Sequence, residues 1–298
     1  MRPVRARASL FRSASALAPL VALCGCFARP PASPMPTAAA ALDRLKETGR
    51  CGTSLQAGAK IDHFGKEGRV RGDLLMFTAA PASLRMDIVS PFGATLATLT
   101  SDGSRFALAD LRDKRFYVGP ASACNLARLT TVPMPAHVLV DLLRGQAPVL
   151  KRQGEPTIAW SGHGYYVVSI ASTRDAHEEL HLAPDPDDFG KPWNEQRLRL
   201  LDVKVEQYGG VVYHAELTEH RAAHTAPPRV DPEHIEPDLP SGVACDAEIP
   251  RRIHVSVPDE HADVLFRYED VSWNPPLPQG TFVQPPPEGM PTVPVTCE

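Results

Sequence analysis

The sequence lacks the local patterns that most often mark an enzyme active site. It contains no Gly-x-Ser-x-Gly nucleophile elbow, no phosphate-binding loop and no Gly-x-Gly-x-x-Gly ahead of a helix. No two cysteines have the Cys-x-x-Cys spacing of zinc and redox sites. The acidic stretch 185–188 lacks the glycine and the distant glutamate of a calcium-binding loop. We therefore expect a protein that is not an enzyme and holds no cofactor.

Concentrated positive charge and long hydrophobic runs are missing as well. Nucleic-acid binding needs a concentrated positive face, and this chain carries a formal net charge of −4 with no basic stripe. After residue 25, no segment is apolar for long enough to span a membrane as a helix. The interval 40–274 is long enough for one domain with a sizeable core. Nucleic acid is thereby excluded as an expected partner.

The N-terminus has the features of a bacterial export signal. The first dozen residues hold four arginines and no acid, and the apolar run 14–23 that follows is too short to remain in a bilayer. Leu23-Cys24-Gly25-Cys26 resembles the lipobox, in which the last cysteine is acylated and becomes the first mature residue. We predict a lipoprotein signal peptide at 1–25 and lipid attachment at Cys26; an ordinary secretory signal is the alternative. Removing four arginines takes the net charge from −4 to −8.

Both ends of the mature chain are rich in proline. Residues 26–39 are predicted to form a tether between lipid and domain, and residues 275–298 a second segment outside the core. Acyl chains on Cys26 hold a protein on membrane lipid, because each buried methylene contributes about 0.8 kcal/mol. Residue 27 is Phe rather than Asp, so nothing resembles the inner-membrane retention signal of enteric bacteria. The expected location is the periplasmic face of the outer membrane.

Four cysteines follow the predicted anchor, namely Cys51, Cys124, Cys245 and Cys297. An even number in an exported chain indicates two disulfides, and four cysteines allow three pairings. The pairing we favour is Cys51–Cys124 with Cys245–Cys297, one bond within the first half and one holding the C-terminal tail.

Short alternating segments dominate the chain from residue 58 onward. Leu84-Arg-Met-Asp-Ile-Val89 alternates apolar and polar residues, which predicts a strand, and Asp102-Gly103 is a tight-hairpin signal. Helical spacing is confined to 39–48, 124–129 and 136–143. This order predicts an α+β, mostly β fold: a strongly curved antiparallel sheet, or half-open β-barrel, with helices covering its concave face.

His177-Glu178-Glu179-Leu180-His181 matches the His-Glu-x-x-His pattern of zinc peptidases. That chemistry needs a helix, where both histidines face one metal and the glutamate activates a water. Here the segment follows a strand and a hairpin-type turn, and Pro184 ends it. In a strand the histidines would lie about 13 Å apart, too far for one ion. A strand is the preferred interpretation, and a zinc peptidase is a remote alternative.

Several short motifs, in order along the chain, resemble the LolA/LolB-like superfamily of bacterial outer-membrane lipoprotein carriers and receptors. They are Pro81-Ala-Ser-Leu84-Arg85-Met-Asp-Ile-Val-Ser-Pro91, Ile88-Val-Ser90-Pro91-Phe-Gly93, Val132-Pro-Met-Pro-Ala-His-Val-Leu-Val-Asp-Leu-Leu-Arg-Gly145 and Tyr268-Glu-Asp-Val-Ser-Trp-Asn274-Pro-Pro-Leu-Pro. The resemblance implies a LolB-like half-open barrel, closed by helices, whose apolar cavity holds acyl chains of phospholipids or lipoproteins.

The resemblance also suggests where a ligand would bind. Arg85 would lie at the cavity mouth, as the corresponding arginine does in the carrier, although an exposed strand charge is an equal alternative. Other expected cavity residues are Leu84, Ile88, Leu96 and Val167. The leading hypothesis is thus a lipid- or lipoprotein-binding protein of outer-membrane biogenesis. The alternative is an envelope scaffold with the same fold and a filled core.

Overall fold

The computed structural model describes residues 27–65, 68–90, 92–130, 132–233 and 237–296. Its α-helices are α1 (Ala38–Thr48), α2 (Ala123–Thr130) and α3 (Ala136–Leu143), with 3-10 turns η1 (Pro186–Asp188), η2 (Trp193–Glu195) and η3 (Pro258–Glu260). The strands are β1 (Ser54–Gly65), β2 (Gly68–Ala79), β3 (Ser83–Val89), β4 (Thr95–Ser101), β5 (Arg105–Asp110), β6 (Arg115–Pro120), β7 (Thr157–Trp160), β8 (Tyr166–Ala171), β9 (Ala176–Pro184), β10 (Leu198–Gln207), β11 (Gly210–Ala222), β12 (Glu248–Val257), β13 (Ala262–Trp273) and β14 (Thr292–Pro294).

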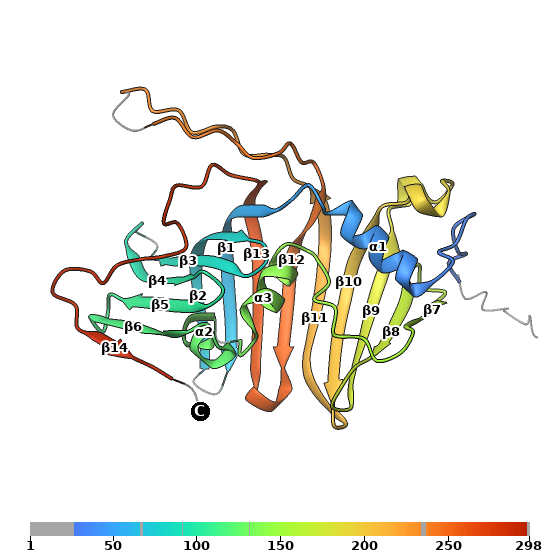
Figure 1. Cartoon of the computed structure of the whole chain (residues 1–298), viewed down its shortest axis with the longest axis horizontal. Coiled ribbons are helices and arrows are strands. Elements are labelled where there is room, and N and C mark those ends of the chain that lie inside the picture. Colours follow the sequence, from blue (N-terminus) through green and yellow to red (C-terminus); the bar gives the residue numbers. More distant parts are fainter. Residues whose placement is uncertain (1–26, 66–67, 91, 131, 234–236, 297–298) are drawn as a thin grey trace, which may run out of the picture.

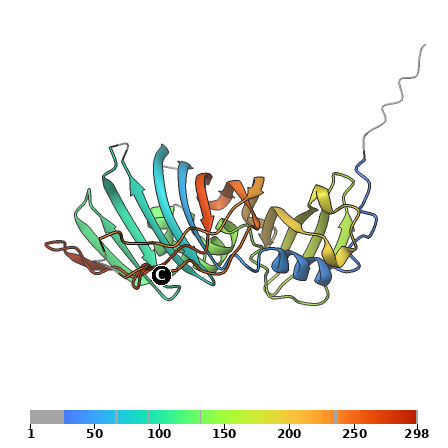
Figure 2. The same cartoon turned by 90° about the horizontal axis from the view of Figure 1, so that it is seen from above.

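All these strands belong to one curved sheet, in the order β14-β6-β5-β4-β3-β2-β1-β13-β12-β11-β10-β9-β8-β7. Neighbouring strands are antiparallel, except that β14 adds to β6 in parallel. The first and last strands of this order lie at opposite ends of the molecule, so the sheet does not close into a barrel (Figures 1 and 2). The prediction of a mostly β fold with a large curved antiparallel sheet is confirmed.

Alternation along the strands gives the sheet two unlike faces. In β1, Leu55, Ala57 and Ile61 are buried on one face, while Lys60 and Asp62 lie on the other. We call the first the helical face, because its buried side chains form one cluster with those of the three helices. The second is the open face. Helix α1 packs on β10 and α3 on β2 and β3, whereas α2 lies against β5 (Figure 1).

The helices begin and end where the sequence supplies the required groups. Helix α1 starts after Thr37, whose hydroxyl accepts a hydrogen bond from the backbone N–H of Ala40. Leu42 and Leu45 lie on its buried side. Helix α3 ends before Gly145, which has a φ of 70°. A Cβ at Gly145 would lie 2.7 Å from the Cδ atom of Pro250, so this close approach requires glycine. No helix among the described residues is long and apolar enough to cross a membrane.

The N-terminal segment 28–35, predicted to be part of a free tether, lies against the β7–β8 end of the sheet. The backbone N–H of Ala28 donates to the carbonyl of Gly162 over 2.8 Å, and the indole N–H of Trp160 donates to the carbonyl of Ala28. Further along, the N–H of Met35 donates to the hydroxyl of Tyr166. These hydrogen bonds give a proline-rich stretch fixed contacts with the domain, and its composition alone does not indicate them.

The C-terminal tail crosses the open face of the other half of the sheet (Figure 1). The side-chain amide of Gln284 donates to the backbone carbonyls of Thr98 in β4 and Ala107 in β5. Beyond it, β14 pairs with β6 and covers one edge of the sheet. The tail is thus part of the folded structure, and Val295 packs against the main core.

The predicted disulfide pairing is wrong. Cys51 is bonded to Cys245, across 194 residues of sequence. The reason is topological: β1 pairs with β13, which brings the segment before β1 beside the segment before β12. Cys124 is also disulfide-bonded, and Cys297 lies outside the described residues. Cys26, the predicted lipid attachment site, lies outside them as well.

Candidate functional site

The five residues expected to line a cavity do not lie together. Leu84 and Ile88 are on the helical face of β3, beside other core residues. Arg85 lies between them in sequence and therefore on the open face. By the same alternation, Val167 is on the open face of β8. Leu96 lies at a register shift between β3 and β4 and is not part of the apolar cluster on the helical face. Tertiary structure thus divides this set between the two sides of the sheet.

Arg85 is engaged by an acid on its own strand. Its Nε atom donates to the carboxylate of Asp87 over 2.9 Å, and the hydroxyl of Thr98 donates to the same carboxylate over 2.6 Å. The tail residues 278–281 border this ion pair. Arg85 thus lies beneath the C-terminal tail, on the side of the sheet away from the helices.

The helical face is closely packed. Leu99 of β4, Leu139 of α3 and Phe266 of β13 are all fully buried, and they belong to the same apolar cluster. Tyr268 of β13 joins α3 to the sheet, because its hydroxyl donates to the carbonyl of Leu143 over 2.7 Å. Any ligand that binds between helices and sheet must displace side chains or move α3.

One carboxyl group lies within this apolar layer. Glu178 of β9 is fully buried on the helical face, and its Oε2 atom accepts a hydrogen bond from the backbone N–H of Leu150 over 2.8 Å. Its Oε1 atom has no hydrogen-bond partner among the described residues, and neither has the buried hydroxyl of Tyr213. Burial raises the pKa of Glu178 to about 7. The pKa of Tyr213 is also raised, mainly by burial and to a smaller extent by the negative charge of the nearby Glu178.

The raised pKa of Glu178 makes folding stability depend on pH. The unfolded chain ionises this group near pH 4.5 and the folded chain near pH 7, so stability is expected to fall as pH rises through that interval. The loss is at most about 3 kcal/mol. Glu178→Gln should remove this pH dependence, as measured by urea unfolding between pH 4 and 8. The exposed Glu155→Gln is the control, and an unchanged slope in Glu178→Gln would contradict the assignment.

The His177-Glu178-Glu179-Leu180-His181 segment is part of strand β9, as preferred from the sequence. Its histidines are therefore on the open face, while Glu178 points into the helical face. His181 hydrogen-bonds to Glu179 over 2.9 Å and stacks on Tyr165. In the part of the chain that the structure describes, no three potential ligands are grouped to hold a metal. This geometry gives no support to the zinc-peptidase alternative.

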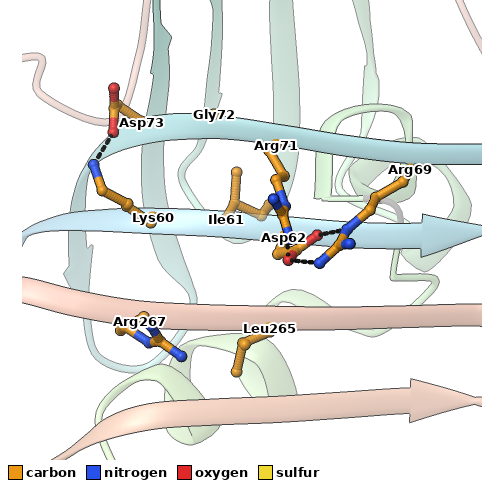
Figure 3. Close-up of a pocket in the computed structure, with 9 residues that line it drawn as sticks. All are labelled: Lys60, Ile61, Asp62, Arg69, Arg71, Gly72, Asp73, Leu265 and Arg267. Carbon is orange, nitrogen blue, oxygen red and sulfur yellow. Dashed lines mark hydrogen bonds and ion pairs between the residues drawn. The ribbon is translucent and has the colours of Figure 1, made fainter. Parts of the chain in front are cut away.

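The open face carries a polar groove that the sequence analysis missed. It runs over β2, β1 and β13, with a volume of about 620 Å³ (Figure 3). Its lining comprises Lys60, Ile61, Asp62, Arg69, Arg71, Gly72, Asp73, Leu265 and Arg267. The available signal was the spacing of charges two residues apart, in Lys60 and Asp62 and again in Arg69, Arg71 and Asp73. Such spacing places charges on one strand face.

Comparison with known proteins gives structural neighbours only. No family model matches the chain, and no curated protein matches it. A DUF1329 family protein from Desulfovibrio piger is 9% identical, with coverage of 82% of this chain and 96% of the other and a TM-score of 0.49. A LolA superfamily protein from Nitrosomonas europaea is 12% identical, with 83% and 98% covered and a TM-score of 0.45. A putative outer membrane lipoprotein-sorting protein domain from Vibrio parahaemolyticus is 9% identical, with 82% and 97% covered and a TM-score of 0.43.

One of these neighbours is a member of the superfamily that the sequence motifs resemble. At such identities a likeness concerns the fold alone, so no ligand or partner is transferred from them.

Proposed function

We propose that this chain is a non-enzymatic, membrane-anchored protein of the bacterial envelope that binds the acyl chains of lipids or lipoproteins on its helical face. The observation that supports the proposal is the difference in size between the large sheet and the few short helices that cover its apolar face. A sheet of 14 strands presents an apolar face, and the α-helices on it within the described residues have only 11, 8 and 8 residues. A light helical cover over a large apolar face is suited to opening for apolar ligands.

Helix α3 is the part of this cover that we propose to move. Pro133 and Pro135 precede it and Gly145 follows it, so both ends are marked by residues that interrupt helices. Its fully buried side chains include Leu139 and Leu143. Moving them into water would cost free energy that a bound acyl chain offsets, at about 0.8 kcal/mol for each buried methylene. Binding would then be reversible, because the acyl chain replaces the side chains of α3 on the same apolar face of the sheet.

A filled-core scaffold remains the second candidate, and a specific observation favours it. The helical face is already packed, with Leu99 and Phe266 fully buried beneath the helices. In that case the surface, rather than the interior, would contact an envelope partner. Lipid binding separates the two candidates.

We further propose that acylated Cys26 holds the β7–β8 end of the sheet close to the outer membrane, on its periplasmic side. Phe27, the residue after the anchor, is 79% exposed, and Ala28 is already hydrogen-bonded to Gly162. Two residues of extended chain span only about 7 Å. Trp160 and Tyr165 lie at this end, and aromatic residues with polar tips are favoured at membrane interfaces.

Loss of the hydrogen bond between Tyr268 and Leu143 should favour the open form and strengthen lipid binding. Tyr268→Phe removes one buried hydrogen bond of about 1 kcal/mol, which corresponds to about fivefold tighter binding of a fluorescent fatty acid. Binding is measured by fluorescence titration, and native mass spectrometry gives the stoichiometry. Tyr208→Phe, at a residue 71% exposed, is the matched control. If neither the unaltered protein nor Tyr268→Phe binds the probe, the filled-core scaffold is the better description.

A further inference from the structure

The groove on the open face has an excess of positive side chains. Lys60, Arg69, Arg71 and Arg267 line it together with only two carboxylates, although the chain as a whole is acidic. Figure 3 shows these side chains projecting from three neighbouring strands on the side away from the helices. The groove is separate from the helical face, so an inference about it does not depend on acyl-chain binding there.

Most of the charges in the groove already have partners. The carboxylate of Asp62 accepts two hydrogen bonds from Arg69, at 2.7 and 2.5 Å, and one from Arg71 at 3.1 Å. The hydrogen bonds from Arg69 are the main reason why the pKa of Asp62 is lowered to about 2. Lys60 pairs with Asp73 at 2.6 Å and with Glu269 at 3.3 Å. Both carboxylates that line the groove are therefore occupied by these cations.

Arg267 has no such partner. Within the described part of the chain it forms neither an ion pair nor a side-chain hydrogen bond, and Figure 3 shows it beside Leu265 with no contact drawn. In the sheet register it lies directly between Arg252 of β12 and Lys60 of β1. Directly opposed side chains have Cβ atoms about 5 Å apart, and like charges in that position are destabilising. A bound anion would remove this repulsion.

The groove also offers apolar contact. Leu265 forms part of its lining, and Leu75, two residues from Asp73 on the same face of β2, is 52% exposed. A ligand that suits this surface carries an anionic group with several acceptor oxygens next to a less polar part. The planar fork of an arginine donates two parallel hydrogen bonds to such oxygens.

We propose that this groove binds a phosphate ester, with Arg267 as the main contact to the phosphate and Arg252 and Lys60 beside it. A phosphate monoester has three terminal acceptor oxygens, one for each of the three cations, whereas a carboxylate has two. Leu265 and Leu75 would contact the esterified part. A soluble phosphate monoester such as glycerol 3-phosphate presents all three oxygens, whereas the phosphodiester of a glycerophospholipid headgroup presents two non-bridging oxygens and one negative charge next to an apolar part.

The test uses the mature, full-length protein in a neutral sugar detergent and isothermal titration calorimetry at low ionic strength. The probes are glycerol 3-phosphate, short-chain dihexanoyl phosphatidylglycerol and acetate. We expect a phosphate ester to bind and Arg267→Gln to weaken it about tenfold, the effect of losing a charge-assisted hydrogen-bonded contact. Lys204→Gln is the matched control, because Lys204 is an open-face cation on β10 that pairs with Glu206 outside the groove.

Each outcome decides the proposal. Binding of glycerol 3-phosphate that is weakened about tenfold in Arg267→Gln supports it with a soluble source. Binding of the short-chain lipid alone supports it with a lipid source if Arg267→Gln weakens that binding and Lys204→Gln does not, whereas lipid binding that is unchanged in Arg267→Gln belongs to the helical face and contradicts it. Three further results would overturn it: no binding of either phosphate ester, acetate binding as tightly as both, or equal weakening by Arg267→Gln and Lys204→Gln. Circular dichroism of each variant shows that the fold is retained.

Discussion

Replacing Asn274 with alanine is expected to lower the free energy of unfolding by about 4 kcal/mol. Its Oδ1 atom accepts hydrogen bonds from the N–H and hydroxyl of Thr53 and from the N–H of Ser54, at 3.0 to 3.2 Å. Its Nδ2 atom donates to the carbonyls of Cys51 and Val243, both at 2.7 Å. The residue is only 2% exposed, so truncation leaves several buried polar groups without partners, each costing about 1–3 kcal/mol.

The backbone of Asn274 adds to this expectation. Its φ is 49°, in the left-handed region that asparagine tolerates better than alanine. Urea unfolding measures the change, with the exposed Asn194→Ala as control. Asn274→Asp keeps the acceptor but sets a carboxylate against the two carbonyls, so it should also be strongly destabilising. A loss below about 1 kcal/mol in Asn274→Ala would show that water replaces these hydrogen bonds.

Removal of the Cys51–Cys245 disulfide should have a similarly large effect. The bond joins cysteines that are 194 residues apart in sequence. Closing a loop of that length lowers the entropy of the unfolded chain, which corresponds to about 5 kcal/mol of stability. Cys51→Ser, Cys245→Ser and the double variant should therefore lose the same stability, as measured by urea unfolding without reductant. Unequal losses, with the double variant near the sum of the single ones, would indicate that the two side chains act by packing rather than through the bond.

The two predictions concern one junction. Asn274 donates to the carbonyl of Cys51 and to that of Val243, two residues before Cys245. The disulfide and the asparagine thus hold together the same three segments, which precede β1, precede β12 and follow β13. Because neighbouring sites couple, we expect a combined variant to lose less than the sum of both effects.

The sequence predicted local structure well. Helix α3 has the predicted bounds, and α1 begins one residue earlier than expected. The Asp102-Gly103 hairpin lies between β4 and β5, with a φ of 93° at Gly103. His177 and His181 are in a strand, as Pro184 and the preceding turn indicated. All these features depend on side chains close together in sequence, where turn chemistry and periodicity act directly.

Errors arose where distant segments meet. The cysteine pairing failed because sequence spacing does not reveal that β1 lies beside β13. The cavity set mixed Leu84 with Arg85, although residues adjacent in a strand face opposite sides. The proline-rich N-terminal segment has a composition typical of a linker, yet Ala28 and Met35 hydrogen-bond to groups more than 100 residues away. The composition of this segment indicates that it cannot form a core of its own, but it does not exclude that the segment packs against the core of the domain.

By itself, the sequence determined that this is a mostly β protein with helices at particular positions and without the usual local motifs of catalysis. Those conclusions follow from periodicity, turn residues and motif spacing, whereas the lipid anchor at Cys26 rests on a resemblance to the lipobox and stays a prediction. Only the tertiary structure decided which strands are neighbours, that Cys51 meets Cys245 and that Arg267 lies between Arg252 and Lys60. The physical reason is that strand pairing brings together residues far apart in sequence, and cross-strand neighbours, not sequence neighbours, set the charge and polarity of each face.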